Sequence, residues 1–195
     1  GVLVQGHIKI HDPESGAVFV NKRNAIHYEN MSIALAESVA NQGQGFISSM
    51  AFGNGGTSVD PTGIITYLTP NSTGTNASLY NQTFTKIVDD RSVSNLDPQR
   101  NKIETRHVNG TNYTDVVVTC LLDYGEPNGQ DATDTASASD SLYVFDELGL
   151  VSYASSGTGK LLTHVIFHPV QKSLNRLIQI DYTVRVQSLT GFNEG

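Results

Sequence analysis

Apolar and polar residues alternate along both ends of the chain. Near the start, the two faces of the pattern hold Val2, Val4, Ile8 and Ile10 against Gln5, His7, Lys9 and His11. Near the end, they hold Ile178, Ile180, Tyr182, Val184 and Val186 against Gln179, Asp181, Thr183 and Arg185. A period of two residues is typical of a strand with one buried face. The pattern therefore predicts two long strands, one near each end.

One segment follows the helical period instead. After Asn30, apolar or small residues recur at the spacing of one helix face, as Met31, Ala34, Leu35, Ser38 and Val39. Asn30 is of a residue type that caps helix N-termini, and Gly43 is of the type that ends helices. The spacing predicts one amphipathic helix over residues 30–41, packed on a sheet.

The rest of the chain favours short strands separated by polar turns. Strands are expected near residues 17–20, 46–52, 64–68, 78–87, 103–108, 115–123, 143–150 and 161–168. Polar stretches rich in Gly, Pro, Asn and Ser predict loops at about 70–80, 89–101 and 125–141. With no internal repeat, the simplest interpretation is a mainly β protein. We expect one domain over residues 1–195, a single β-sandwich with the helix packed on a sheet.

Composition agrees with strands and loops and excludes some function classes. Only 16% of the 195 residues are charged, and 18 are Gly, whereas a helical bundle would be richer in Leu, Glu, Lys and Arg. The net charge of −7, with scattered Lys and Arg, argues against a nucleic-acid surface. We see no signal-like segment or long apolar span, and therefore expect no membrane insertion and no secretion by the usual route.

Two sets of side chains are weighed as metal ligands. His7 and His11, like His164 and His168, share a strand face but lie about 13 Å apart at ~3.3 Å per residue, too far for one metal within a pair. A site across two strands remains an alternative, although exposed or interface histidines are favoured. Three loop carboxylates are a calcium alternative without EF-hand spacing, and a solvated loop is favoured there: Asp131, Asp134 and Asp140.

No catalytic constellation is found in the sequence. Cys120 lies in an apolar run, which favours a buried thiol over a nucleophile. Asp146 and Glu147 are neighbours on a strand and point to opposite faces, so they cannot act as one acid–base pair. We expect them at a strand start, with Glu147 accepting hydrogen bonds from the backbone, Lys172 or Arg176. We predict a non-enzymatic protein with no cofactor, no metal and no catalytic residue.

Five short motifs occur in order along nearly the whole chain. They begin with Asn24-Ala-Ile-His-Tyr28 and Met50-Ala-Phe-Gly-Asn-Gly-Gly-Thr57, and continue with Asp146-Glu-Leu-Gly-Leu150, Phe167-His-Pro-Val-Gln-Lys172 and Asn175-Arg-Leu-Ile-Gln-Ile-Asp-Tyr-Thr183. This order resembles small virion structural proteins of tailed bacteriophages, most closely those of contractile-tailed cyanophages, with a block like that of tail-fibre or collar proteins.

The resemblance implies a structural subunit, present in many copies in the virion, with other virion proteins and copies of itself as partners. We expect a tail, baseplate or collar component that attaches fibres or neighbouring subunits. The first alternative is a capsid decoration protein on the head. A second is a glycan-binding module or depolymerase, which the absence of Trp and of a carboxylate pair disfavours.

The terminal strands are the expected contact surface between subunits. Strands at a sheet edge expose unpaired backbone groups that can pair with another chain, which favours a homo-oligomer. The interface residues expected on these strands are Val2, Val4, Ile8, Ile178, Ile180, Tyr182 and Val184.

Overall fold

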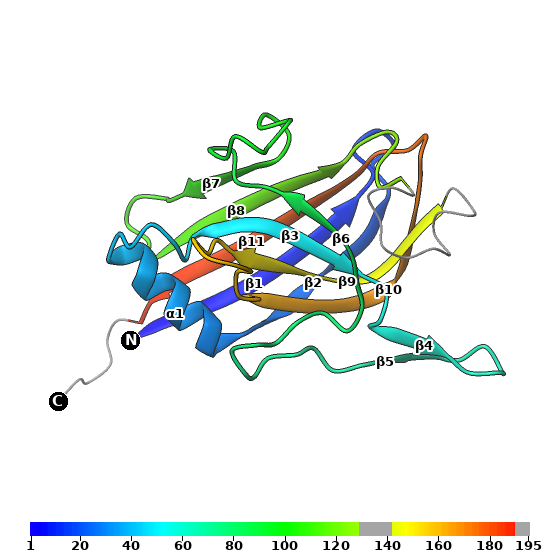
Figure 1. The fold of residues 1–195 in the computed structure, drawn as a ribbon, viewed down its shortest axis with the longest axis horizontal. Coiled ribbons are helices and arrows are strands. Elements are labelled where there is room, and N and C mark those ends of the chain that lie inside the picture. Colours follow the sequence, from blue (N-terminus) through cyan, green and yellow to red (C-terminus); the bar gives the residue numbers. More distant parts are fainter. Residues whose placement is uncertain (129–141, 190–195) are drawn as a thin grey trace.

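A computed structural model describes residues 1–128 and 142–189 (Figure 1). Its elements are β1 (Val2–His11), β2 (Val18–Ile26), α1 (Tyr28–Val39), β3 (Ile47–Gly53), β4 (Thr57–Val59), β5 (Ile65–Tyr67), β6 (Gln82–Ile87), β7 (Lys102–Arg106), β8 (Tyr113–Leu122), β9 (Leu142–Ser152), β10 (Thr163–Ser173) and β11 (Ile178–Ser188). The prediction of a mainly β protein with one helix is therefore confirmed for the part that the structure describes.

Nine strands form one curled antiparallel sheet, in the order β6-β3-β9-β10-β2-β1-β11-β8-β7. The sheet has two halves, β6-β3-β9-β10 and β2-β1-β11-β8-β7, which meet where β10 pairs with β2 through only two residue pairs. The two layers expected of a sandwich are thus halves of a single hydrogen-bonded sheet. Because this junction is short, the halves can turn toward each other without breaking the ladder.

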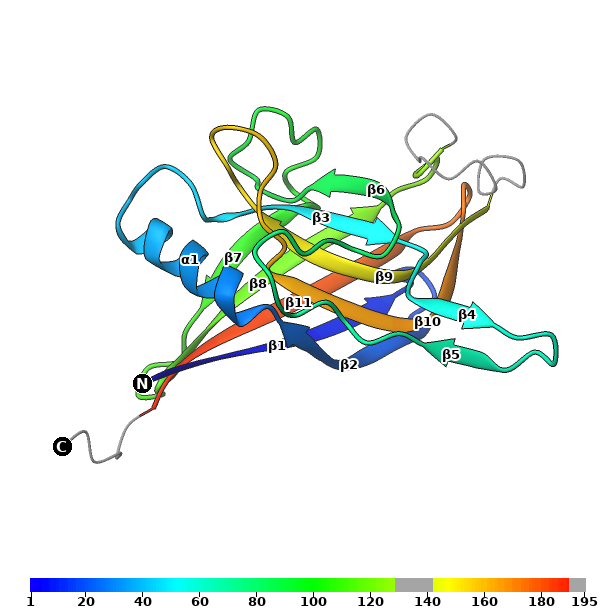
Figure 2. The ribbon, with the colours of Figure 1, turned by 60° about the horizontal axis from the view of Figure 1, so that its bottom comes forward.

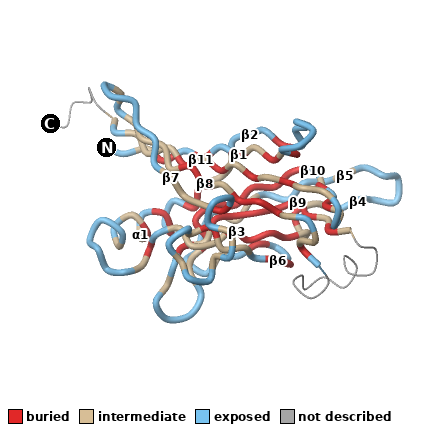
Figure 3. The backbone as a smooth tube through the Cα atoms, turned by 90° about the horizontal axis from the view of Figure 1, so that it is seen from above, coloured by how far each residue is buried: buried red, intermediate tan, exposed pale blue. Residues whose placement is uncertain are grey.

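The main core joins both halves. One cluster of buried apolar residues runs through eight strands of the nine-stranded sheet, including Phe84 of β6, and also takes in Met31 of α1. Buried positions, red in Figure 3, follow the long strands, whereas the exposed positions concentrate in the connecting loops. Five rings pack against one another in the first half: Phe52, Phe84, Tyr143, Phe145 and Phe167. The curled sheet therefore encloses its own hydrophobic core.

Helix α1 starts two residues earlier than predicted, and Asn30 is not its N-cap. The capping group is the ring of His27, whose Nδ1 accepts a hydrogen bond from the backbone N–H of Asn30 at 3.1 Å. Asn30 is itself buried, and its Nδ2 donates to the carbonyl oxygen of Leu161 at 2.9 Å. The predicted buried face is right for Met31 and Ala34, but Val39 lies at the end of the helix and is 87% exposed.

The prediction that β1 and β11 are edge strands is wrong. They pair with each other over ten residue pairs, β2 covers the other side of β1, and β8 covers the other side of β11. Six of the seven expected interface residues are buried in the core of their own chain: Val4, Ile8, Ile178, Ile180, Tyr182 and Val184. Val2 alone among them is exposed, at the tip of β1. The two edges of the sheet are β6 and β7.

Strands β4 and β5 form a separate hairpin that projects from the body (Figure 2). We call residues 57–67 the arm. Its turn is closed by Asp60, whose Oδ1 accepts hydrogen bonds from the backbone of Thr62 and Ile64, both at 2.9 Å. Val59, Ile64 and Tyr67 are each at least half exposed. The sequence predicted β5 but not its partner strand.

The three predicted loops are real loops as far as the structure describes them. Residues 70–80 connect β5 to β6, and residues 89–101 connect β6 to β7. Residues 125–128 follow β8 as a turn, whereas 129–141, with the calcium candidates Asp131, Asp134 and Asp140, lie outside the described residues. The first loop is less exposed than its composition indicates, because Leu79 is buried in a small second cluster beside Ala51 and Leu161.

Candidate functional site

Asp146 and Glu147 lie in the middle of β9, opposite a bulge in β10. The prediction that they start a strand is wrong, since β9 begins at Leu142. Both carboxylates are buried, with 3% and 0% of their surface exposed. The covering residues belong to two loops, 53–57 and 70–81, which donate hydrogen bonds to them. We call Asp146, Glu147 and His164 the carboxylate cluster.

Glu147 accepts four hydrogen bonds. Its Oε2 receives the backbone N–H groups of Gly55 and Asn81, both at 2.9 Å, and its Oε1 receives that of Tyr80 at 2.9 Å and the ring of His164 at 2.8 Å. Burial raises the pKa of Glu147, but these hydrogen bonds, that of His164 foremost, outweigh burial and hold the pKa below its ordinary value. The predicted backbone partners are confirmed. The side chain that donates to Glu147 is His164, and not Lys172 or Arg176 as predicted.

Asp146 holds the base of the arm. Its Oδ1 accepts the backbone N–H of Gly56 at 2.8 Å, and its Oδ2 accepts the backbone N–H and the hydroxyl of Thr57 at 2.9 and 2.5 Å. Burial raises the pKa of Asp146, and the negative charge of Glu147 adds to the rise, although the bonds from Thr57 and Gly56 oppose it. The two neighbouring carboxylates thus clamp three consecutive backbone N–H groups, those of residues 55–57.

His164 is fully buried and has both ring nitrogens engaged. Its Nδ1 accepts the backbone N–H of Asn71 at 2.8 Å, so the proton is on Nε2, which donates to Glu147. The Tyr80 ring lies 5.6 Å away, between centroids. A substrate would have to displace both covering loops to reach this Glu–His pair. The arrangement suits a rigid structural clamp and not proton transfer to a substrate.

The glycine-rich segment 53–56, which lacks the spacing of a nucleotide-binding loop, binds the chain's own carboxylates. Its consecutive N–H groups form an anion-binding turn of the kind that often holds phosphates. At Gly55, a Cβ atom would lie 2.8 Å from both the backbone nitrogen of Asn81 and the Cβ of Tyr80. Glycine is therefore needed there because the loop approaches so closely.

Lys172 was not predicted as a buried residue. It is 0% exposed, and its Nζ donates to the carbonyl oxygens of Asp123, Glu126 and Ser173 at 2.9, 2.7 and 2.7 Å. Burial lowers its pKa to about 8. The available signal was its position on β10, two residues after the apolar Val170 and so on the same face. This lysine ties the turn after β8 to β10.

The remaining candidates are dispersed. Cys120 is fully buried, and burial raises the pKa of its thiol to about 12, as expected for an inert core cysteine. His11 contacts Asp181 at 2.8 Å, whereas His7 and His168 are exposed at separate places. Within residues 1–128 and 142–189, no three His, Cys, Asp or Glu side chains gather in a way that could hold a metal ion.

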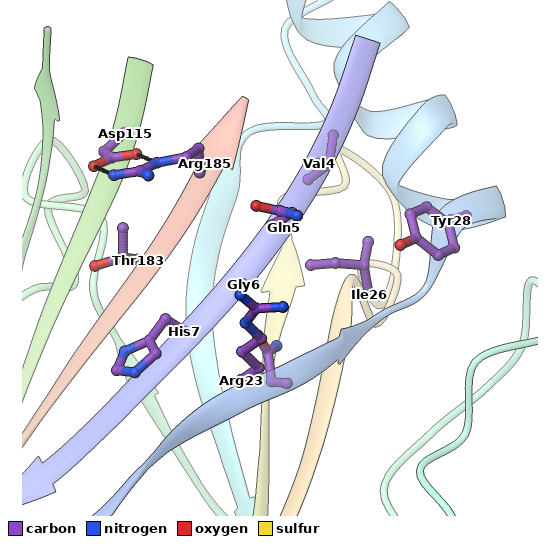
Figure 4. A pocket seen from close by; sticks show the side chains of 11 residues that line it. Val4, Gln5, Gly6, His7, Arg23, Ile26, Tyr28, Asp115, Thr183 and Arg185 are labelled. Carbon is purple, nitrogen blue, oxygen red and sulfur yellow. Dashed lines mark hydrogen bonds and ion pairs between the residues drawn. The ribbon is translucent and has the colours of Figure 1, made fainter. Parts of the chain in front are cut away.

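A polar pocket of about 560 Å³ opens where β2 leaves β1 (Figure 4). The pairing of these strands ends at Gly6 and Asn24, after which β2 pairs with β10. We call this opening the split pocket. Its lining includes Val4, Gln5, His7, Arg23, Asn24, Ile26, Tyr28 and Arg185. Arg185 is occupied, because it binds Asp115 with two hydrogen bonds of 2.8 and 3.0 Å and covers the Tyr113 ring at 3.9 Å.

A smaller apolar cavity of about 240 Å³ lies between α1 and the sheet, beside Met31, Leu35, Ile103 and Val116. The only helix in the described ranges has 12 residues, and it is neither long nor apolar enough to cross a membrane. Comparisons with family models, curated protein sequences and solved structures find no match to this chain.

Proposed function

We propose that the chain is a non-enzymatic structural subunit of a tailed-phage virion, most consistent with a tail, baseplate or collar component that attaches fibres or neighbouring subunits. The observation that carries the proposal is the arm, a projecting hairpin that exposes apolar side chains from a firmly held base. The ordered motifs that resemble phage virion proteins support the same assignment.

The arm has the character of a docking element. An isolated two-stranded hairpin is marginally stable in water, and exposed apolar side chains grouped on one element favour contact with a partner. Val59, Ile64 and Tyr67 are 62%, 63% and 50% exposed. Burying them against a neighbouring subunit would stabilise both the hairpin and the assembly.

The base of the arm coincides with two of the motifs. Asp146 and Glu147 begin the motif 146–150, and their backbone partners Gly55, Gly56 and Thr57 end the motif 50–57. These motifs therefore meet at the clamp that fixes the arm to the sheet. A subunit that transmits contacts through a hairpin needs such a rigid attachment.

The β7 edge of the sheet is a poorer candidate for contact than the arm. Edge strand β7 has only five residues, among them Lys102, Glu104 and Arg106. Short, charged edge strands discourage pairing with another chain. Assembly through the arm also replaces the interface expected on β1 and β11, which their burial rules out.

The proposal is tested by removing the apolar groups of the arm in the full chain. The double variant Ile64→Ser/Tyr67→Ser should fold normally, form smaller species by light scattering, and be lost from phage particles assembled with it. The control Val39→Ser removes an even more exposed apolar side chain from the end of α1 and should assemble as the unmodified chain does. Particle incorporation of the arm variant at the unmodified level would refute the proposal.

A further inference from the structure

We infer that Asn109 is a site of spontaneous deamidation through the backbone nitrogen of Gly110, whereas the carboxylate cluster blocks the same reaction at Asn54, which is also followed by glycine. The inference rests on the hydrogen bonds and the free space around the two Asn-Gly pairs. It does not depend on the proposed function.

The reaction joins the backbone nitrogen of the following residue to the side-chain carbonyl carbon of asparagine. The nitrogen gives up its proton to solvent and forms a bond to Cγ, while the bond from Cγ to Nδ2 breaks and ammonia leaves with a proton from water. Water then opens the resulting five-membered imide at either carbonyl carbon, which gives aspartate or isoaspartate. Overall one water is consumed and one ammonia is released. A following glycine favours the attack because it has no Cβ to hinder the approach.

Asn109 and Gly110 lie in the turn between β7 and β8, beyond the ladder of the two strands, and both are exposed. Thr111 closes this turn, because its N–H and its hydroxyl both donate to the Val108 carbonyl oxygen, at 3.1 and 2.7 Å. Within the described residues, no hydrogen bond holds the Gly110 N–H or the Asn109 side chain. The nucleophilic nitrogen and the amide carbon are therefore both available to react.

At the second pair, the nucleophilic nitrogen is occupied. The Gly55 N–H donates to Oε2 of Glu147 at 2.9 Å. The Asn54 side-chain oxygen accepts a hydrogen bond of 2.5 Å from Nδ2 of Asn81, and the Asn54 N–H donates to the Asn81 carbonyl oxygen at 3.0 Å. Removing the proton from the Gly55 nitrogen would place a second negative charge beside the Glu147 carboxylate, which is unfavourable. The clamp at the base of the arm thus opposes the first step of the reaction.

The space around the two glycines differs in the same direction. Ring closure requires the asparagine side chain to turn back onto the next peptide unit, and that unit has to rotate. A Cβ atom placed at Gly55 would lie 2.8 Å from the Asn81 nitrogen and from the Tyr80 Cβ, whereas one placed at Gly110 meets nothing within 4 Å. The first peptide unit is confined and the second has room to rotate.

Modification at Asn109 should leave the fold intact. The product adds one negative charge to an exposed turn, and isoaspartate also lengthens the backbone there by one methylene. Because this turn lies outside the pairing of β7 with β8, the ladder does not have to change. Folded molecules should therefore accumulate the modification as they age.

The test is incubation of the full chain in mildly alkaline buffer, with peptide mapping by mass spectrometry and an enzymatic assay for isoaspartate. In the folded chain, Asn109 should lose its amide at least about tenfold faster than Asn54. In concentrated urea, where only the shared local sequence remains, the two rates should agree within about threefold. Equal rates in the folded chain, or no loss at Asn109, would overturn the inference. Asn128 is followed by Gly129, which lies outside the described residues, so this third pair is not compared.

Variants assign the signal to one residue. Asn109→Gln should abolish isoaspartate in the peptide that spans the turn between β7 and β8, which also contains Asn112. The matched control Asn54→Gln should leave the amount in that peptide unchanged. Because Asn109 is exposed and its side chain has no hydrogen bond within the described ranges, Asn109→Gln should keep the melting temperature of the unmodified chain. Isoaspartate that persists in this peptide of Asn109→Gln would place the reaction at another residue and contradict the inference.

Discussion

The carboxylate cluster and the split pocket are both polar regions beside the same narrow junction of the sheet, but they differ in how their polar groups are satisfied. In the cluster, Glu147 accepts four hydrogen bonds, and both nitrogens of His164 are engaged. In the pocket, the Arg23 side chain and the Asn24 Oδ1 have no partner within the described residues. Satisfied polar groups fix a structure, whereas a buried polar group without a partner costs the fold stability.

The number of partners, and not burial alone, separates the two kinds of polar residue. A buried Glu–His pair looks catalytic in isolation, yet its complete set of partners and zero exposure identify a clamp. The Asn24 oxygen is buried as well, yet it has no partner among the described residues, so it costs the fold stability instead of fixing it.

The largest effect is expected for Glu147→Ala. The change leaves three backbone N–H groups and the His164 ring without their shared acceptor in a buried site. Removing one partner of a buried ionic network costs about 3–5 kcal/mol, and urea unfolding of the variant should show a loss of this size. Glu104→Ala, on exposed strand β7, is the control and should change stability by less than about 0.5 kcal/mol. Similar small effects for both would show that the cluster is not a clamp.

Gly55→Ala should destabilise the protein by about 1–3 kcal/mol, because overpacking forces neighbouring atoms apart. The new Cβ would lie 2.8 Å from the Asn81 nitrogen and from the Tyr80 Cβ, so the loop would have to move away from Glu147. Thermal unfolding measures the loss. Ser58→Ala, nearby on the exposed side of the arm, should leave the melting temperature unchanged. A tolerated alanine at residue 55 would mean that the loop does not approach as closely as described.

The two carboxylates should have opposite effects on stability in acid. The pKa of Glu147 is lowered in the folded state, so its contribution is present above the unfolded value of 4.5 and is lost as pH falls through the folded pKa. The pKa of Asp146 is raised above 3.8, so on acidification Asp146 takes up a proton in the folded state before it does so in the unfolded state. The contribution of Asp146 to the free energy of unfolding therefore increases as pH falls through the folded pKa toward 3.8.

Denaturant unfolding measured between pH 6 and pH 3 separates these effects. Over this range of about 3 pH units, each group can change the free energy of unfolding by up to about 1.4 kcal/mol per pH unit. Glu147→Gln should flatten the loss of stability on acidification, and Asp146→Asn should steepen it. The same pH dependence in both variants would refute the opposite pKa directions.

The smallest effect, and one of opposite sign, is expected in the split pocket. Asn24→Val removes a buried oxygen that has no partner in the described ranges and places a β-branched residue in a strand. The gain should be about 0.5–1 kcal/mol, since the desolvation cost of the amide disappears. Asn30→Ala is the comparison. The Asn30 Oδ1 is also buried without a partner in the described ranges, but its Nδ2 donates to the Leu161 carbonyl oxygen at 2.9 Å, so its loss should be destabilising. A destabilised Asn24→Val would mean that this amide supports the fold.

The sequence predicted those parts of the fold that depend on local periodicity. The alternation in β1 and β11 and the buried face of α1 around Met31 and Ala34 are right, because these patterns depend only on which face meets the core. The helix start was misplaced because His27 caps through a ring nitrogen, a role that residue type does not reveal.

What the sequence could not predict depends on contacts between distant residues. Terminal position suggested edge strands, but the order of strands places β1 and β11 beside each other in the interior. The clamp joins Glu147 to residues that precede it by 66 to 92 positions in the sequence. The split pocket exists because β2 changes its partner strand from β1 to β10. A local hint existed for the clamp: β9 is apolar on both faces, as in Phe145, Leu148 and Leu150, which is unusual for a strand with a solvent-facing side.

Cryo-EM of the tailed-phage particle in which we propose that this chain is a subunit tests the central claim, assembly through a firmly clamped arm, most directly. We expect density for this chain in the tail, baseplate or collar, with Val59, Ile64 and Tyr67 buried against a neighbouring subunit. Density on the icosahedral shell would instead assign a capsid decoration protein. Absence of the chain from the particle, or an arm that touches nothing there, would contradict the account.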